Sequence, residues 1–204
     1  MSAIRRILRY LAHRDARYEG LYRRLCRPGG IEWAEMLRGR GDFNAIGEHC
    51  YIDPYALIEG RMFIRLGNNV RLATCFMFCA DGSVNMINRA FGLHLDSVGK
   101  IDIRDNVYIG HHVIVLPGVT IGPNAIVSAG SVVRSDVGEG DVVAGVPARR
   151  VGRLEMSVAM LKAKNQKLPW RHLIEKRASE FDPDMEPELN RMRLEFFYAS
   201  GEKR

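Results

Sequence analysis

Aliphatic residues recur at every sixth position through the middle of the chain. One series consists of Ile103, Ile109, Val115, Ile121, Val127 and Val133, and an earlier one of Ile46, Ile52, Ile58 and Ile64. This spacing fits neither a helix, with about 3.6 residues per turn, nor the two-residue alternation of a strand. It is typical of a solenoid, in which the chain turns a corner after each short strand and stacks its aliphatic side chains inward. The pattern therefore predicts an all-β solenoid.

The series shifts by two positions after Ile64, so that Leu66, Leu72 and Phe78 are expected to face inward. Between residues 79 and 100 the period disappears, and it resumes at Ile101 and Ile103. This interval is too long for a turn and too short for a domain, so we interpret it as an excursion loop that leaves the stack. The solenoid is thus expected to span residues 42–152, interrupted at 79–100.

Both flanks of the solenoid have helical periodicity. Residues 1–41 predict two amphipathic helices, with apolar stripes at Ile4, Ile7, Leu8 and Leu11 and at Tyr18, Leu21, Tyr22 and Leu25, the second ending at Pro28-Gly29-Gly30. Residues 153–204 predict one helix with Leu154, Val158 and Leu161 on one face and another after Pro187 with Leu189, Met192, Phe196 and Phe197. Helical appendages at both ends would cover the open edges of the stack.

The net charge of +6 is concentrated in residues 1–40, which contain ten arginines against Asp15, Glu19, Glu32 and Glu35. No base-stacking aromatics or nucleic-acid motif accompany these arginines, which argues against a nucleic-acid partner. Two interpretations stay open: a helical cap with solvated arginines, or a basic amphipathic face that contacts a membrane or a glycan-lipid substrate. No apolar run is long enough for a membrane span, and no signal-peptide core is visible, so we expect a cytoplasmic protein.

The cysteines and histidines show no metal-binding pattern. Cys26, Cys50, Cys75 and Cys79 form no CxxC pair, so we expect reduced residues in or near the core. His111 and His112 are adjacent, and neighbouring strand residues face opposite ways, so they would not chelate one ion together. We therefore expect a protein that requires no metal.

Three motifs stand out at the end of the repeats: LPGV at 116–119, SAGSVV at 128–133 and AGVPA at 144–148. With them, residues 46–152 closely resemble the hexapeptide-repeat acyltransferases. The resemblance implies a left-handed parallel β-helix, a homotrimer with active sites between subunits, and acetyl-CoA as co-substrate. Coenzyme A would contact Gly110, His111, Ser128, Ala129, Gly130, Pro147 and Ala148, with Arg134, Arg149 and Arg150 available for its phosphates.

The segment Asp81-Gly82-Ser83-Val84 resembles the branch of sugar O-acetyltransferases that modify surface polysaccharides or their precursors. In that branch the catalytic histidine precedes the Asp-Gly pair, whereas this chain has Ala80, which cannot accept a proton. Three interpretations are open. Ala80 is an engineered substitution of the histidine, or His94 folds back toward Asp81 and serves as the base, or the protein is a catalytically inactive trimeric binding or scaffold protein.

Acceptor contacts are expected from the excursion loop. Asn85, Asn88, Arg89 and Asp96 supply the mixture of donors and acceptors that suits a hydroxyl-rich sugar. The resemblance thus implies a carbohydrate or glycan-precursor acceptor, without specifying the sugar or the hydroxyl. A zinc hydratase of the related β-helix type is a weaker alternative, because its His-x4-His pair is absent from the sequence.

Overall fold

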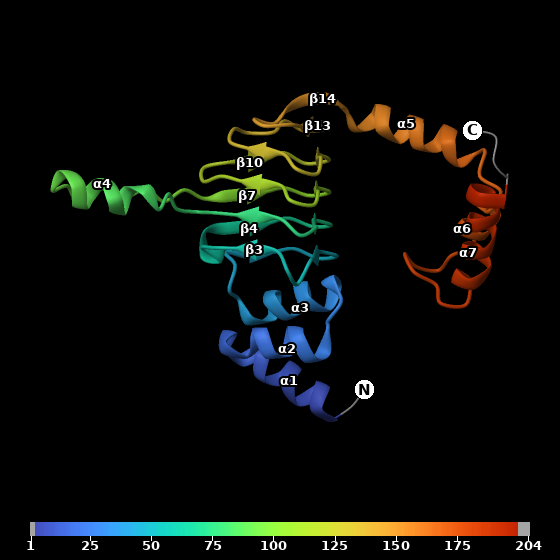
Figure 1. The fold of residues 1–204 in the computed structure, drawn as a ribbon, viewed down its shortest axis with the longest axis horizontal. Helices are drawn as coiled ribbons and strands as arrows, with labels where there is room; N and C mark the ends of the chain where they lie inside the picture. The colour runs from blue at the N-terminus through green and yellow to red at the C-terminus, as the bar shows by residue number, and fades with distance from the viewer. Residues whose placement is uncertain (1–2, 200–204) are drawn as a thin grey trace. The chain divides into compact units, whose positions relative to one another are not determined.

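Short parallel strands build the centre of the molecule. A computed structural model describes residues 3–199, and in it the chain visits three sheets in turn (Figure 1). Sheet A contains β1 (Ala45–Ile46), β4 (Ile64–Leu66), β7 (Ile101–Ile103) and β10 (Thr120–Ile121). Sheet B contains β2 (Tyr51–Ile52), β5 (Arg71–Leu72), β8 (Tyr108–Ile109), β11 (Ile126–Val127) and β13 (Asp141–Ala144), followed by the antiparallel β14 (Arg149–Arg153). Sheet C contains β3 (Leu57–Ile58), β6 (Phe76–Met77), β9 (Ile114–Val115) and β12 (Val132–Val133).

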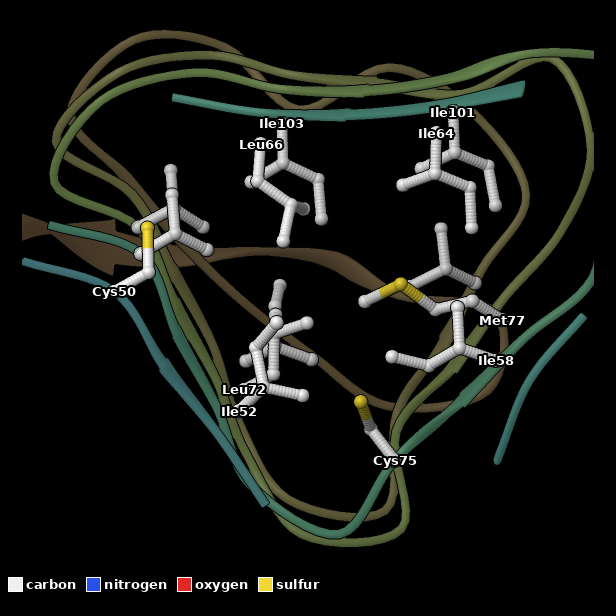
Figure 2. Close-up of a cluster of buried hydrophobic side chains, with 14 of the residues drawn as sticks. Cys50, Ile52, Ile58, Ile64, Leu66, Leu72, Cys75, Met77, Ile101 and Ile103 are labelled. Atoms are coloured by element: carbon white, nitrogen blue, oxygen red, sulfur yellow. The ribbon is translucent and has the colours of Figure 1, made fainter. Parts of the chain in front are cut away.

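The second half of the stack follows the six-residue period without interruption. Ile103 pairs with Ile121, Ile109 with Val127 and Val115 with Val133, one pair in each sheet. These six side chains are fully buried, which confirms the predicted inward positions. A view along the stack shows the three-sided outline of the chain, with the aliphatic side chains of successive coils lying over one another inside it (Figure 2).

The first half of the stack departs from the period at two places. A short helical turn, η2 (Arg61–Phe63), precedes β4 and accounts for the shift of two positions. The expectation that Phe78 faces inward is wrong, because Met77 pairs with Ile58 and is fully buried while Phe78 is half-buried. The corner between β5 and β6 is one residue shorter than a regular hexad, so the inward position comes one residue early.

Three helices, and not the predicted two, precede the stack: α1 (Ala3–Arg14), α2 (Glu19–Cys26) and α3 (Gly30–Arg40), with a short turn η1 (Ala16–Tyr18) before α2. The missed helix α3 packs against β1 and β2, burying Trp33 and Leu37. It was missed because Gly29, expected to end a helix, also caps the start of α3. The predicted stripes are only partly buried: Leu8 and Tyr22 are covered, whereas Ile4 and Leu25 remain 66% and 60% exposed.

The interval between the two halves of the stack is more than a loop. Its two ends run antiparallel, because Gly99 N donates to Cys79 O at 2.7 Å and Asp81 N donates to Ser97 O at 3.0 Å. Between them lies helix α4 (Ser83–Phe91), which buries none of its side chains. We call residues 79–100 the arm, and Figure 1 shows α4 standing away from the coils.

The chain divides into two compact units, one through Leu154 and one from Glu155. The second is helical, with α5 (Leu154–Asn165), α6 (Arg171–Ile174), α7 (Glu186–Leu194) and a final turn η3 (Glu195–Ala199). Its apolar centre is Trp170, whose ring meets Phe196 and Phe197 edge-on at 5.4 and 5.8 Å. The predicted face of α5 is not buried, and α7 begins one residue before Pro187, which suits the first turn of a helix.

Three of the four cysteines lie in the core. Cys50, Cys75 and Cys79 are buried and Cys26 is partly buried, and all four are free thiols, as predicted. Burial raises the pKa of the Cys75 thiol to about 12, so it stays protonated at neutral pH. No helix in the described part of the chain has both the length and the apolar character needed to cross a membrane.

Candidate functional site

The start of the arm places Ala80 and Asp81 at one end of sheet C. Ala80 is exposed and forms an isolated antiparallel bridge with Val98 across the arm. The carboxylate of Asp81 accepts a hydrogen bond from Ser83 N at 2.9 Å. Hydrogen bonds from the Ser83 side chain and backbone hold the pKa of Asp81 below its ordinary value. Asp81 therefore stays ionised and supports the first turn of α4.

The structure does not bring His94 and Asp81 together within one chain. Leu93 N donates to Asn88 O at 3.0 Å, and the Asn88 amide both donates to and accepts from the backbone of Leu95 at 2.8 Å. These bonds hold His94 beside the C-terminal part of α4, whereas Asp81 precedes the N-terminus of that helix. His94 is exposed there.

The expected acceptor residues divide into two kinds. Asn88 uses its amide to close the arm, and Asp96 accepts a hydrogen bond from Ser97 N at 2.8 Å. Both side chains thus have a local structural role. Asn85 and Arg89 lie on the exposed surface of α4 and are accessible to a ligand.

The residues expected to contact the cofactor gather at the corner between sheets B and C. Gly130 N donates to His111 O at 2.8 Å, which stacks the Ser128–Gly130 corner on Gly110 and His111. A Cβ atom on Gly110 would approach Ala129 N to 2.6 Å, so the two coils meet where only glycine fits. His111 and His112 are both exposed at this corner, and the His112 ring lies 6.5 Å from that of Phe76.

The segment from Gly145 to Ala148 covers the same region one coil further on. Ala148 N donates to Val132 O at 2.8 Å, and Gly145 N donates to Ser131 Oγ at 3.1 Å. Arg149 and Arg150 follow in β14, where Arg150 Nη1 lies 3.9 Å from Asp141 Oδ1. Arg134 follows β12 and therefore lies at the opposite end of sheet C, toward the side from which the arm leaves. The three predicted arginines are not one cluster.

Between these two ends, the outer face of sheet C is apolar. Leu57, Phe76, Ile114 and Val132 occupy equivalent outward positions on the four strands. Leu57 is 46% exposed and the other three side chains are half-buried. This row was not predicted, although each of its members directly precedes an inward apolar residue.

A charged group on the outer face of sheet A was not predicted either. Arg65, Lys100 and Asp102 line a cleft beside the end of the arm, together with Asn44, Met62, Phe63 and Ile101. Its signal in the sequence is Ile101-Asp102-Ile103, where an acidic residue stands between two inward isoleucines. In the described part of the chain, no three His, Cys, Asp or Glu side chains are grouped as a metal site.

Comparison with known proteins agrees with this architecture. Residues 100–135 match the bacterial transferase hexapeptide (six repeats) family. Galactoside O-acetyltransferase of Escherichia coli is 53% identical over 141 residues, covering 60% of this chain and 69% of that protein. A relative from Schizosaccharomyces pombe is 39% identical over 93 residues, and the chain spans 44% of its length.

A solved structure shares the fold over a longer stretch. The hexapeptide-repeat acetyltransferase from Vibrio cholerae superposes with a TM-score of 0.53 at 26% identity, covering 75% of this chain and 94% of that one. The repeats, the family match and the identity to an O-acetyltransferase over more than two thirds of its length agree. This chain therefore belongs to the hexapeptide-repeat acyltransferase family.

Proposed function

We propose that this protein is an acetyl-CoA-dependent O-acetyltransferase that acts on a sugar or a surface-polysaccharide precursor. Its three-sheet coil would then be a left-handed parallel β-helix. The observation that carries the proposal is the extended identity to galactoside O-acetyltransferase together with the corner of small residues at Gly110 and Ser128–Gly130. A thin pantetheine chain fits against such a corner because no side chain keeps it away from the backbone.

We further propose that the active form is a homotrimer in which sheet C is covered. The row Leu57, Phe76, Ile114 and Val132 supports this, since an exposed apolar surface on a coil is expected to be buried against a partner. The exposed arm supports it as well, because no residue of α4 is fully buried within its own chain. The end of sheet C that carries the arm and the end that carries His111 would then meet between neighbouring copies.

Transfer of the acetyl group requires three contributions from this chain. The thioester must be aligned with the acceptor hydroxyl, donors must stabilise the oxyanion, and a base must take the hydroxyl proton. The corner at Gly110 and Gly130 would align the donor, and the exposed side chains of Asn85 and Arg89 would contact the acceptor. Arg134, beyond β12 of sheet C, and Arg149 and Arg150, on β14 of sheet B, would bind phosphates through their forked donors.

His94 is the base that we propose for the assembled trimer. It is an exposed histidine on the arm, and histidine suits proton transfer near neutral pH. Asp81 would not orient its ring within the same chain, because that carboxylate supports α4. His94 would instead act on an acceptor held between neighbouring copies.

The test is an acetyl-CoA consumption assay against a panel of sugars, with the unsubstituted Ala80 protein, His94→Gln and Ala80→His. A loss of about 100-fold or more in His94→Gln supports the proposed base. His172→Gln, a change of the same kind on α6, is the control and should keep full activity. Persistence of activity in His94→Gln would remove His94 from the mechanism. Failure of every variant to bind acetyl-CoA, measured by calorimetry beside the assay, would overturn the proposed function.

A second function is favoured by one specific observation, the exposed Ala80 at the position where related enzymes carry histidine. It is a trimeric β-helix protein that binds its ligands or serves as a scaffold without turnover. In that case the unsubstituted Ala80 protein binds acetyl-CoA in calorimetry but releases no thiol, and Ala80→His alone gains activity.

We also propose that the N-terminal helices contact an anionic membrane surface. Ile4, Ile7, Leu21 and Leu25 are between 46% and 66% exposed in a segment that holds the whole net positive charge. Exposed apolar side chains among arginines are suited to the lipid headgroup region. Cosedimentation with vesicles containing phosphatidylglycerol tests this, and Ile7→Ser with Leu25→Ser should abolish it. Equal amounts of protein in the pellet with and without vesicles would contradict the proposed membrane contact.

A further inference from the structure

The cleft on the outer face of sheet A lies where the arm rejoins the coil. It encloses about 160 Å³ between Met62 and Phe63 on η2, Arg65 on β4 and Lys100 to Asp102 at the start of β7. The arm is anchored directly beside it by the hydrogen bond from Gly99 N to Cys79 O. A ligand held in this cleft would therefore lie beside the arm.

Asp102 is the unusual residue of this cleft. It points outward from β7 between Arg65 and Thr120, yet it is 3% exposed. Two guanidinium groups approach its Oδ2 atom: Arg104 Nη2 at 3.1 Å and Arg65 Nη1 at 4.0 Å. Its Oδ1 atom is buried and has no hydrogen-bond partner among the residues that the structure describes.

A buried carboxylate oxygen without a donor is unfavourable, because the desolvation of that oxygen is not compensated. A hydroxyl donor would satisfy it once a side-chain movement of the kind common on ligand binding opens access to this buried oxygen. The surrounding charge favours a ligand that carries a negative group as well, since Arg65, Lys100 and Arg104 supply three positive charges against the single Asp102. Lys100 and Arg65 are both exposed enough to turn toward an anion.

The opposite wall of the cleft is apolar. Met62 and Phe63 are 65% and 44% exposed, so their side chains are available to a ligand. The C–H face of a pyranose ring packs well against such side chains, while its hydroxyl groups need acceptors at the ring edge. The cleft thus combines a surface for a sugar ring, a hydroxyl acceptor and cations for an acidic substituent.

We propose that this cleft is a subsite for an acidic sugar residue of the acceptor, in which Asp102 Oδ1 accepts a hydrogen bond from a ring hydroxyl and Arg65 with Lys100 binds the anionic group. This inference rests on the proposed function, because it specifies the acceptor class of the same enzyme. The class is a sugar that carries a carboxylate, in place of a neutral hexose.

The experiment compares binding of the methyl glycosides of glucuronic and galacturonic acid with their neutral glucose and galactose counterparts, by ligand-observed NMR on the full-length protein. We expect at least one uronide to bind about tenfold more tightly than its neutral counterpart. Arg65→Gln should reduce that preference by about fivefold or more, because it removes one charge-assisted contact. Arg38→Gln, which changes an exposed arginine of α3, is the matched control and should leave it unchanged.

Asp102→Ala tests the hydroxyl contact separately. It should weaken uronide binding relative to inorganic phosphate, because the hydroxyl acceptor is lost while the cations remain. Equal binding of charged and neutral sugars, equal binding of phosphate and uronide, or no binding at all overturns the inference. Acetyl-CoA affinity is measured on every variant. Unchanged acetyl-CoA binding with no uronide preference refutes the subsite alone, and loss of acetyl-CoA affinity in Arg65→Gln would instead place Arg65 in the cofactor site.

Discussion

Sheets A and C are built alike on the inside and differently on the outside. Both have four short strands in parallel register, and both send aliphatic side chains inward to the same core. On its outer face, sheet A carries Ala45, Arg65, Asp102 and Thr120 at equivalent positions, whereas sheet C carries Leu57, Phe76, Ile114 and Val132.

This difference separates folding from function in the coil. The inward positions serve the same purpose in both sheets, because each places an apolar side chain against its neighbours in the adjacent coils. The outward positions are not used for folding in the same way, so their chemistry can specialise. We infer that the charged face of sheet A binds a ligand and that the apolar face of sheet C binds another copy of the chain.

The largest expected effect comes from placing a charge on the apolar face. Ile114→Glu should prevent assembly, because a carboxylate buried without a partner in an interface is strongly unfavourable. Sedimentation velocity should show a monomer. The circular dichroism spectrum should be unchanged, which shows that the variant is folded. Ile126→Glu, the same change on the outer face of sheet B, is the matched control and should remain assembled. A trimer in both variants would exclude sheet C as the interface.

The next largest effect is expected at an inward position. Ile103→Ala should lower the free energy of unfolding by about 2–5 kcal/mol, because Ile103 is fully buried and its loss leaves a cavity. Thr120→Ala, on the outer face of the same sheet, should change it by less than about 0.5 kcal/mol. Urea unfolding in the Ile114→Glu background checks both values without a contribution from assembly. Similar costs at the two positions would contradict the division between inner and outer faces.

A smaller effect concerns the ion-pair cluster beside the first strand of sheet A. Burial of Glu19 and Asp42 opposes their ionisation, but hydrogen bonds from Arg61 and Arg40 outweigh it and lower both pKa values. Carboxyl groups with lowered pKa values stabilise the folded state above their unfolded pKa, which is about 4. That stabilisation is lost as the pH falls through the folded pKa.

The free energy of unfolding should therefore be level from about pH 7 to about pH 5 and decrease below about pH 4. Glu19→Gln should lower the free energy of unfolding by about 1.5–3 kcal/mol at neutral pH, since Arg61 Nη1 donates to Glu19 Oε1 at 2.7 Å. The substitution should also make the free energy of unfolding decrease less steeply in acid. An identical pH profile in Glu19→Gln and wild type would show that this cluster is not responsible.

The smallest effect is expected at the corner between sheets A and B. Asn106 donates to Asn124 and accepts from Asn69, at 3.0 and 2.9 Å, in a row of asparagine side chains. Asn106→Ala should lower the free energy of unfolding by about 1 kcal/mol or slightly more. The variant loses these hydrogen bonds and keeps a φ of 57°, which alanine disfavours. Asn106→Gly separates the two causes, since glycine tolerates that φ. A lower melting temperature for Asn106→Gly than for Asn106→Ala would show that the positive φ is not the main cause of the loss.

Sequence patterns predicted the regular part of the coil well and its irregular parts poorly. The series from Ile103 to Val133 was right at every position, because every coil there has the same length. The inward role of Phe78 was wrong because the short corner between β5 and β6 brings the inward position one residue earlier, to Met77. Helix α3 was missed because Gly29 and Gly30 read as a helix end, and the close approach of Gly30 to Tyr51 is a long-range contact with no local signal.

The candidate site divides in the same way. The small-residue corner at Gly110 and Ser128–Gly130 could be predicted, because family motifs identify it and the coil period stacks it. The expected contact between His94 and Asp81 could not be assessed from the sequence, because it depends on the direction of α4 and on the bonds between Asn88 and Leu95. Asp102 was missed because the arginines that approach it come from β4 and from the residue after β7, which meet only in the folded coil.

By itself, the sequence determined the repeat, the inward aliphatic positions and the family of this protein. Those features are local and periodic, so they can be read from spacing and residue type alone. Only the tertiary structure decided which outward side chains become neighbours: the apolar row of sheet C, the separation of Arg134 from Arg149 and Arg150, and the cleft around Asp102. The physical reason is that these groups meet across coils, where the corners and the arm between them set the register.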